Sequence, residues 1–170
     1  MFLIHWPGSD AFEDSWKALE ELYAVGKIKA IGVSNFQIQH LEKLFTFAKV
    51  IPAINQIELH PKLSQLELRK YSESKDIKIQ AWSPLMQGKL LSNPIIESIA
   101  THHNKSTAQI ILRWDVQQDI LLNVKSTHIE RMHNNADIFD FELTDNEMNQ
   151  LNELNEDLRV GPDPDSFDFE

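Results

Sequence analysis

Short apolar runs alternate along the chain with longer stretches in which apolar residues recur every three or four positions. The runs have the sequences FLIH, KAIGV, AINQIEL, IKIQAW and DILLNV, at residues 2–5, 29–33, 53–59, 77–82 and 119–124. Short apolar runs predict buried strands, and the helical recurrence between them predicts amphipathic helices. The alternation repeats about every thirty residues, the size of a βαβ unit. The pattern therefore predicts an α/β fold with a parallel sheet flanked by helices.

Capping residues indicate where several of the predicted helices begin or end. Gly26 is a stop signal for the first helix, and Asn35 and Ser106 are N-cap residues for later ones. Thr144 with Glu147 three residues later forms a capping box. Helices are expected at 11–25, 36–48, 64–75, 94–102, 106–117, 128–136 and 145–154.

Two architectures fit this alternation, an open doubly wound sheet and a (β/α)₈ TIM barrel. An open sheet that binds a dinucleotide carries a glycine-rich turn after a strand. The sequence contains neither GxGxxG nor GxxxxGK[ST], and it has only 5 glycines. Polar or aromatic residues instead follow every predicted strand, and barrel active sites are built from these strand ends. The barrel is favoured, although only five of its eight strands are predicted.

Composition excludes several classes of function. The 26 acidic residues outnumber the 16 basic ones, for a formal net charge of −10, which argues against a nucleic-acid or anionic-membrane binder. No apolar run approaches the about 20 residues that span a bilayer, and the first residues lack the charged region of a signal peptide. The chain has no Cys, so thiolate zinc sites and disulfides are excluded, and a reducing cytoplasm is the expected location.

Six ordered motifs resemble the aldo-keto reductase family. They are LIHWPG, SWKALEELYAVGKIKAIGVSNF, NQIELHP, AWSPLMQGKL, AQIILRW and a KS pair followed by Arg, and GPDP follows near the end of the chain. The branch they resemble most is that of the bacterial 2,5-diketo-gluconic acid reductases. The resemblance implies a (β/α)₈ barrel and NADPH-dependent reduction of a small aldehyde or ketone. It also implies that residues 1–170 form the C-terminal part of one barrel domain, strands four to eight, with 155–170 as a surface tail.

The resemblance assigns His5 a catalytic role. In the family, the histidine of the HWP motif orients the substrate carbonyl through its ring N–H. A neutral imidazole donates one such bond while its other nitrogen accepts, and it stabilises negative charge that develops on oxygen. Considered alone, a single His at a strand end is more often a hydrogen-bonded structural residue.

Ser34, Asn35 and Gln56 are candidates for binding the nicotinamide carboxamide. They follow consecutive strands, and Asn and Gln each offer both a donor and an acceptor. In the family this contact fixes which face of the nicotinamide meets the substrate. The alternative is that Ser34 and Asn35 only begin a helix.

Trp82 and the loop after it are candidates for the rest of the cofactor. The resemblance places an aromatic ring at the position of Trp82, stacked on the nicotinamide. It places Ser83 and Leu85 in a loop that folds over the pyrophosphate, with contacts from backbone N–H groups and from Ser83. A Trp that only lines the core is the alternative.

Lys125, Ser126 and Arg131 are candidates for a phosphate site after the last strand. A helix N-terminus attracts anions, Arg binds phosphate with two parallel bonds, and Lys adds a point charge. In the family these positions bind the 2′-phosphate, so NADPH is favoured over NADH. The alternative is three ordinary surface residues.

Two positions depart from the family pattern near this site. Val124 replaces a Pro before the Lys, and Asn134 replaces the Glu of a Glu-Asn pair that faces the adenine. Asn135 matches the second member of that pair. The replacement of a carboxylate by Asn134 is expected to weaken the contact with the adenine amino group without abolishing binding.

The catalytic set is incomplete in this sequence. The Asp, Tyr and Lys of the family's tetrad match no residue here, since Tyr23 and Tyr71 fall in predicted helices. We expect little or no carbonyl reduction by the chain alone, and open sheet edges that aggregate, dimerise or pair with the missing N-terminal half of the barrel. The alternatives are a non-catalytic NADP-binding or interaction module and a decayed gene fragment.

A metal site is not expected from the sequence. His102 and His103 are neighbours, but adjacent residues on a helix do not face one another. Neither a Cys nor an evident third ligand accompanies them.

Overall fold

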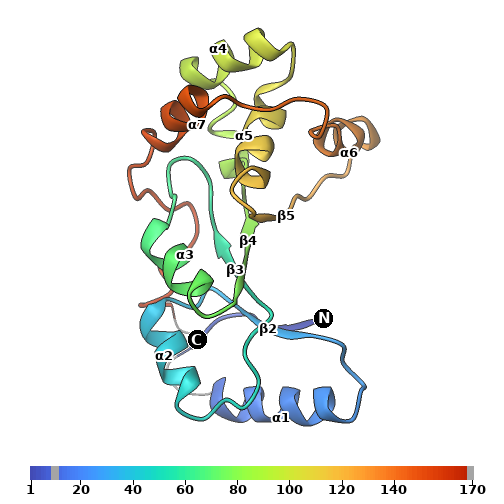
Figure 1. Ribbon diagram of the computed structural model, residues 1–170, viewed down its shortest axis with the longest axis vertical. Coiled ribbons are helices and arrows are strands. Elements are labelled where there is room, and N and C mark those ends of the chain that lie inside the picture. The colour runs from blue at the N-terminus through green and yellow to red at the C-terminus, as the bar shows by residue number, and fades with distance from the viewer. Residues whose placement is uncertain (9–11, 168–170) are drawn as a thin grey trace. The chain divides into compact units, whose positions relative to one another are not determined.

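The computed structural model describes residues 1–8 and 12–167, and five strands lie in this part of the chain (Figure 1). Their order in the sheet follows the sequence, β1-β2-β3-β4-β5. β1 pairs with β2 and β2 with β3, both in parallel. The predicted parallel α/β sheet is confirmed. The strands are β1 (Phe2–Ile4), β2 (Ile31–Ser34), β3 (Ile54–Glu58), β4 (Lys78–Trp82) and β5 (Leu121–Asn123).

The described residues also form seven α-helices at the seven predicted places. Their ends differ from the predicted ones by a few residues. A short 3₁₀ helix after β4, η1 (Met86–Gly88), was not predicted. The helices are α1 (Phe12–Ala24), α2 (Ile38–Phe45), α3 (Leu66–Glu73), α4 (Pro94–His103), α5 (Thr107–Val116), α6 (Ile129–Ala136) and α7 (Asp145–Asn152). None of them is both long and apolar enough to cross a membrane.

The chain divides into two compact units. Unit 1 consists of Met1–Ile57, Gln65–Gln80 and Gly161–Glu170, and unit 2 of Glu58–Ser64 and Ala81–Val160. The core of unit 1 includes the fully buried side chain of Trp16 from α1. In unit 2, α4, α5 and α7 lie together (Figure 1), and α5 contributes the fully buried Trp114. Each unit therefore has an apolar core of its own.

The predicted caps are confirmed at two helices and wrong at a third. Ser106 caps α5, and Thr144 and Glu147 form the capping box of α7. The N-cap of α2 is Gln37, whose backbone N–H donates to His40 Nδ1 over 3.0 Å. Asn35 does not cap this helix, because its backbone is left-handed (φ 64°) and its side chain bonds elsewhere.

The segment 155–170, which was expected to be a surface tail, makes hydrogen bonds and a ring contact within the two units. In unit 2, the Val160 N–H donates to Glu58 Oε1 over 2.7 Å. In unit 1, Gln39 Nε2 donates to Asp165 Oδ1 over 2.7 Å. The Phe167 ring packs on Trp6 there, with the ring centroids 4.3 Å apart.

The capping box of α7 predicts sensitivity to acid. Burial raises the pKa of Glu147, but hydrogen bonds from Thr144 and from His102 and His103 outweigh burial, and the pKa falls from 4.5 to about 2. A lowered carboxyl pKa stabilises the fold above the unfolded value, and this stabilisation is lost as the pH falls toward the folded value. We expect stability to decline between pH 4.5 and about 2, and less steeply in Glu147→Gln. Urea unfolding of both proteins across this range measures the difference, and parallel declines would contradict the assignment.

Candidate active site

Three predicted cofactor residues meet in unit 1, where the end of β2 lies beside β3. Ser34 is in register with Gln56, and its hydroxyl donates to the Gln56 backbone carbonyl over 2.8 Å. Asn35 follows in the left-handed conformation, which Asn tolerates better than most residues. Its Nδ2 donates to the His5 carbonyl over 3.0 Å and to Ser34 Oγ over 3.1 Å. Three strands are thereby joined through one polar cluster.

Gln56 gives this cluster an amide that is accessible to a ligand. Its side chain is half-buried, whereas Ser34 and Asn35 are buried. Gln56 Nε2 donates to Gln80 Oε1 over 2.6 Å. Among the residues that the structure describes, the Gln56 side-chain oxygen has no hydrogen-bond partner. The oxygen of this amide therefore remains available to an N–H donor.

His5 joins the cluster through its backbone. Its carbonyl accepts from Asn35, while its ring is exposed and lies 6.0 Å from the Trp6 ring, centroid to centroid. The arrangement fixes the chain direction at the end of β1. The exposed His5 side chain is accessible to a substrate.

In unit 2, β4 ends at Trp82 and leads into a strained loop. Trp82 is half-buried, and its carbonyl accepts from the Leu59 N–H over 3.3 Å. Positive φ angles, rare for residues other than glycine, occur at Ser83 (54°), Met86 (50°) and Gln87 (55°). Such strain clusters at ligand clamps and switch regions.

Two backbone N–H groups of this loop donate hydrogen bonds within the loop itself. The Met86 N–H donates to the Ser83 carbonyl and the Gly88 N–H to the Leu85 carbonyl, both over 2.8 Å. These two N–H groups are engaged within the loop. The contacts expected from the loop to a ligand are thus left to the Ser83 side chain and to other backbone groups, Leu85 among them.

The predicted phosphate residues lie in unit 2 around the start of α6. Lys125 and Arg131 are exposed, and Arg131 occupies the first turn of the helix. Ser126 Oγ accepts from the His128 N–H over 3.2 Å and shapes the turn into the helix. Asn135 is half-buried one turn beyond Arg131, so both side chains lie on one face of α6.

Two features of the strand ends were missed by sequence reasoning. Gln80 holds the Gln56 amide, and its polar side chain within the otherwise apolar run IKIQAW was the available signal. Glu58 and His60, at the end of β3 in unit 2, form a fully buried pair with His60 Nε2 3.1 Å from Glu58 Oε1. Their alternation in INQIELH places both on one side of the strand.

Comparison with known proteins decides the family. A model of the aldo/keto reductase family matches residues 1–156. The chain belongs to this family. The resemblance found in the sequence is confirmed at this level.

Members of the family with similar sequences include two from Bacillus subtilis. The chain is 57% identical over 169 residues to an uncharacterized oxidoreductase, YtbE, matching 99% of this chain and 60% of the relative. It is 54% identical over 169 residues to a glyoxal reductase, matching 99% and 61%. The chain therefore spans about three fifths of the length of these curated relatives.

A solved structure agrees with the fold of this chain. A crystal structure of a Gox0644 mutant in complex with NADPH matches 98% of the chain and 63% of its own length, with a TM-score of 0.94 and 39% sequence identity. The similarity in sequence and in fold covers both units described above.

Proposed function

We propose that the chain is part of an NADPH-dependent aldo-keto reductase that reduces aldehydes or ketones to alcohols in the cytoplasm. Family membership supports the reaction, and the NADPH complex of a relative supports the cofactor. The observation that carries the proposal is the polar cluster of Ser34, Asn35 and Gln56 at the end of β2 and in the neighbouring β3. We place the chain as the C-terminal portion of an eight-stranded barrel, in the branch resembling 2,5-diketo-gluconic acid reductases.

The chemistry of the polar cluster fits a nicotinamide carboxamide. NADPH supplies the hydride when it is bound. The Gln56 side-chain oxygen accepts from the carboxamide N–H₂ group, and Ser34 and Asn35 are held in place by their own hydrogen bonds. Because these bonds fix the two side chains, little ordering is left for ligand binding to impose. The ring N–H of His5 donates to the substrate carbonyl and orients it.

The residues of unit 2 suit the remainder of the cofactor. By the family resemblance Trp82 would stack on the nicotinamide, which would add about 0.5–1.5 kcal/mol beyond burial if values for aromatic pairs apply. Ser83 and Leu85 contact the pyrophosphate from the strained loop. Lys125, Ser126 and Arg131 bind the 2′-phosphate, and Asn135 faces the adenine on the same side of α6.

We propose that catalysis and a closed sheet need further strands, which the N-terminal half of the barrel would supply. Tyr23 is exposed on α1 and Tyr71 lies on α3, and neither follows a strand. Phe2 in β1 is 61% exposed and Leu121 in β5 is 45% exposed, whereas strands of parallel sheets are normally buried on both faces. General acid catalysis contributes about 10²–10⁴-fold, so NADPH oxidation with an aldehyde should be slower by that order than in a complete reductase.

The carboxamide assignment is tested with Asn35→Gly, since glycine keeps the left-handed backbone without strain. Asn35→Gly removes the two hydrogen bonds that Asn35 Nδ2 donates within the polar cluster. Each hydrogen bond contributes about 1 kcal/mol, so the loss should weaken NADPH binding about tenfold, as measured by calorimetry. Asn104→Gly is the matched control, because Asn104 is also left-handed (φ 53°) but exposed at the end of α4. Circular dichroism checks that both variants are folded. Equal affinity for NADPH in the two variants would refute the role of Asn35.

A further inference from the structure

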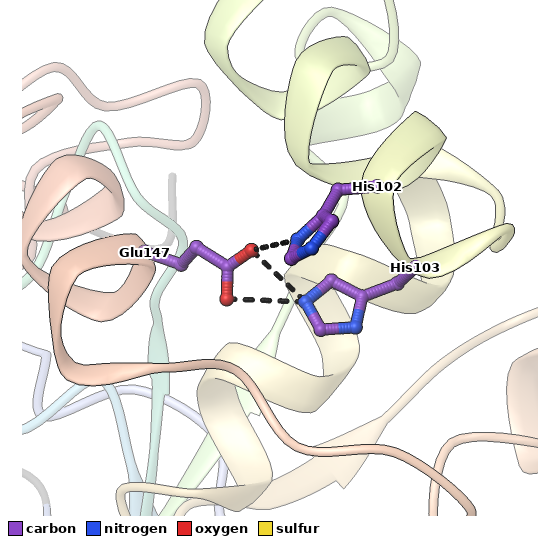
Figure 2. A group of neighbouring side chains, drawn as sticks. All are labelled: His102, His103 and Glu147. Carbon is purple, nitrogen blue, oxygen red and sulfur yellow. Dashed lines mark hydrogen bonds and ion pairs between the residues drawn. The ribbon is translucent and has the colours of Figure 1, made fainter.

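We propose that His102, His103 and Glu147 form a binding site for a divalent transition-metal ion such as Zn²⁺, joining α4 to α7 within unit 2. The three residues offer two imidazole nitrogens and a carboxylate oxygen, and these ligand atoms all lie within 4.8 Å of one another. Figure 2 shows both rings pointing toward the Glu147 carboxylate. The proposal is independent of the reductase function, since none of the three belongs to the residues assigned to NADPH or the carbonyl.

The third ligand removes the objection raised by the sequence. His102 and His103 are adjacent and do not need to face one another, because Glu147 lies between them. His102 Nδ1 is 2.9 Å and His103 Nε2 is 3.0 Å from Glu147 Oε1. Glu147 follows His103 by 44 residues in the sequence, so only folding brings the set together.

The two imidazole-to-carboxylate distances require only a small adjustment for a metal ion, and all three ligand atoms lie within 4.8 Å of one another. Zinc binds His nitrogen and carboxylate oxygen at about 2.0–2.2 Å in tetrahedral geometry, which separates neighbouring ligand atoms by about 3.4 Å. The two imidazole-to-carboxylate distances would each lengthen by a few tenths of an ångström. His102 is 71% exposed at its side chain, which leaves its ring room to turn toward an ion. Each imidazole must present an unprotonated nitrogen, which the neutral tautomers allow.

Hydrogen bonds from neighbouring groups orient the Glu147 carboxylate, as outer-shell residues orient the ligands of known metal sites. Thr144 donates its backbone N–H over 2.8 Å and its hydroxyl over 2.9 Å to Glu147 Oε2. These bonds fix the carboxylate with Oε1 beside both histidines and Oε2 3.1 Å from His103 Nε2. His103 is fixed in turn by the Phe141 ring, with the centroids 5.3 Å apart. Outer-shell contacts of this kind raise metal affinity in known sites.

Charge also favours a cation at this position. The histidines end α4, where backbone carbonyls point outward, and a helix C-terminus attracts positive charge. The nearby Lys105 is paired with Asp137 at 3.0 Å and with Asp140 at 2.7 Å, so its charge is largely compensated. The side chain of Glu147 is 9% exposed and that of His103 14%, while His102 opens the site to solvent for entry and for water ligands. Three protein ligands with an open position are typical of zinc sites that keep a water.

Calorimetric titration of ZnCl₂ into the chelator-treated full chain, without a histidine tag, tests the site. We expect one ion per chain. His102→Ala should weaken zinc binding at least about tenfold, since loss of even an outer-shell partner costs about 10–100-fold in metal affinity. Because the His102 side chain is exposed, this substitution should leave the fold intact. Glu147→Gln, which keeps a capping-box residue type but removes the charge, should weaken it as well. His133→Ala, an exposed histidine on α6, is the matched control and should bind as wild type does.

Two results would overturn the proposal. One is no zinc binding by the wild-type chain, which would leave the three residues as a hydrogen-bonded contact between α4 and α7. The other is undiminished binding in a folded His102→Ala variant, which would place the ion elsewhere. Circular dichroism confirms that each variant is folded, and a folded His102→Ala variant alone suffices to decide.

Discussion

Arg131→Ala is expected to weaken NADPH binding about 10- to 100-fold while leaving NADH binding unchanged. Hydrogen bonds to a charged group contribute about 1.5–3 kcal/mol, and each 1.4 kcal/mol is about tenfold in affinity. Arg131 is exposed in the first turn of α6, so its removal should not disturb the core. Only NADPH carries the 2′-phosphate that the guanidinium is proposed to bind. Calorimetric titrations with both nucleotides measure the difference.

Lys70→Ala controls for net charge in this experiment. Lys70 is exposed on α3 and makes only a surface ion pair with Glu67, 3.6 Å between Nζ and Oε1. Its loss removes the same charge as Arg131→Ala and should leave NADPH affinity unchanged. If Arg131→Ala lowered the affinity for NADPH and for NADH by a similar factor, Arg131 would not bind the 2′-phosphate.

Gly32→Ala is expected to destabilise the fold by about 3 kcal/mol, the upper end of the cost of overpacking. A Cβ atom at Gly32 in β2 would lie 2.7 Å from the Ile54 carbonyl oxygen of β3 and 2.9 Å from Leu3 Cδ2 of β1. The carbonyl is backbone, so the clash is relieved only by moving strands. Domains are stable by only about 5–15 kcal/mol, so the loss is a large share of the total. Urea denaturation measures it.

Gly26→Ala separates steric clash from backbone strain. A Cβ at Gly26 meets nothing within 4 Å, but its φ of 73° disfavours other residues. The cost should therefore be about 1–2 kcal/mol, the penalty of the left-handed conformation. A Gly32→Ala protein at least as stable as Gly26→Ala would contradict the close packing of the first three strands.

Strands and helices followed from local pattern because each is encoded within a few neighbouring residues. The run IKIQAW predicted β4, and Ser106 with Gln109 predicted the start of α5. The prediction that Asn35 caps a helix was wrong, because a residue that commonly caps helices is also one that tolerates a left-handed backbone. Its bond to the His5 carbonyl joins positions 30 residues apart, and local pattern holds no information about such a contact.

The candidate site was found through motifs rather than geometry. Ser34 and Gln56 could be paired by the rule that parallel strands end at one edge. Gln80 as a partner of Gln56, the turns that engage the Met86 N–H, and the meeting of His103 with Glu147 all depend on tertiary packing. A metal site was not expected at His102 and His103, because adjacent helix residues do not face one another and no third ligand lies near them in the sequence.

Nuclear magnetic resonance of the ¹⁵N-labelled chain during titration with NADPH tests the central claim most directly. The side-chain amide signals of Asn35 and Gln56 report on the carboxamide contact, and the Arg131 signal reports on the 2′-phosphate. The account predicts shifts at all three that saturate together, with NADH shifting only the two amides. Saturable binding that leaves Asn35 and Gln56 unmoved, or no binding by a chain with a well-dispersed spectrum, would contradict it.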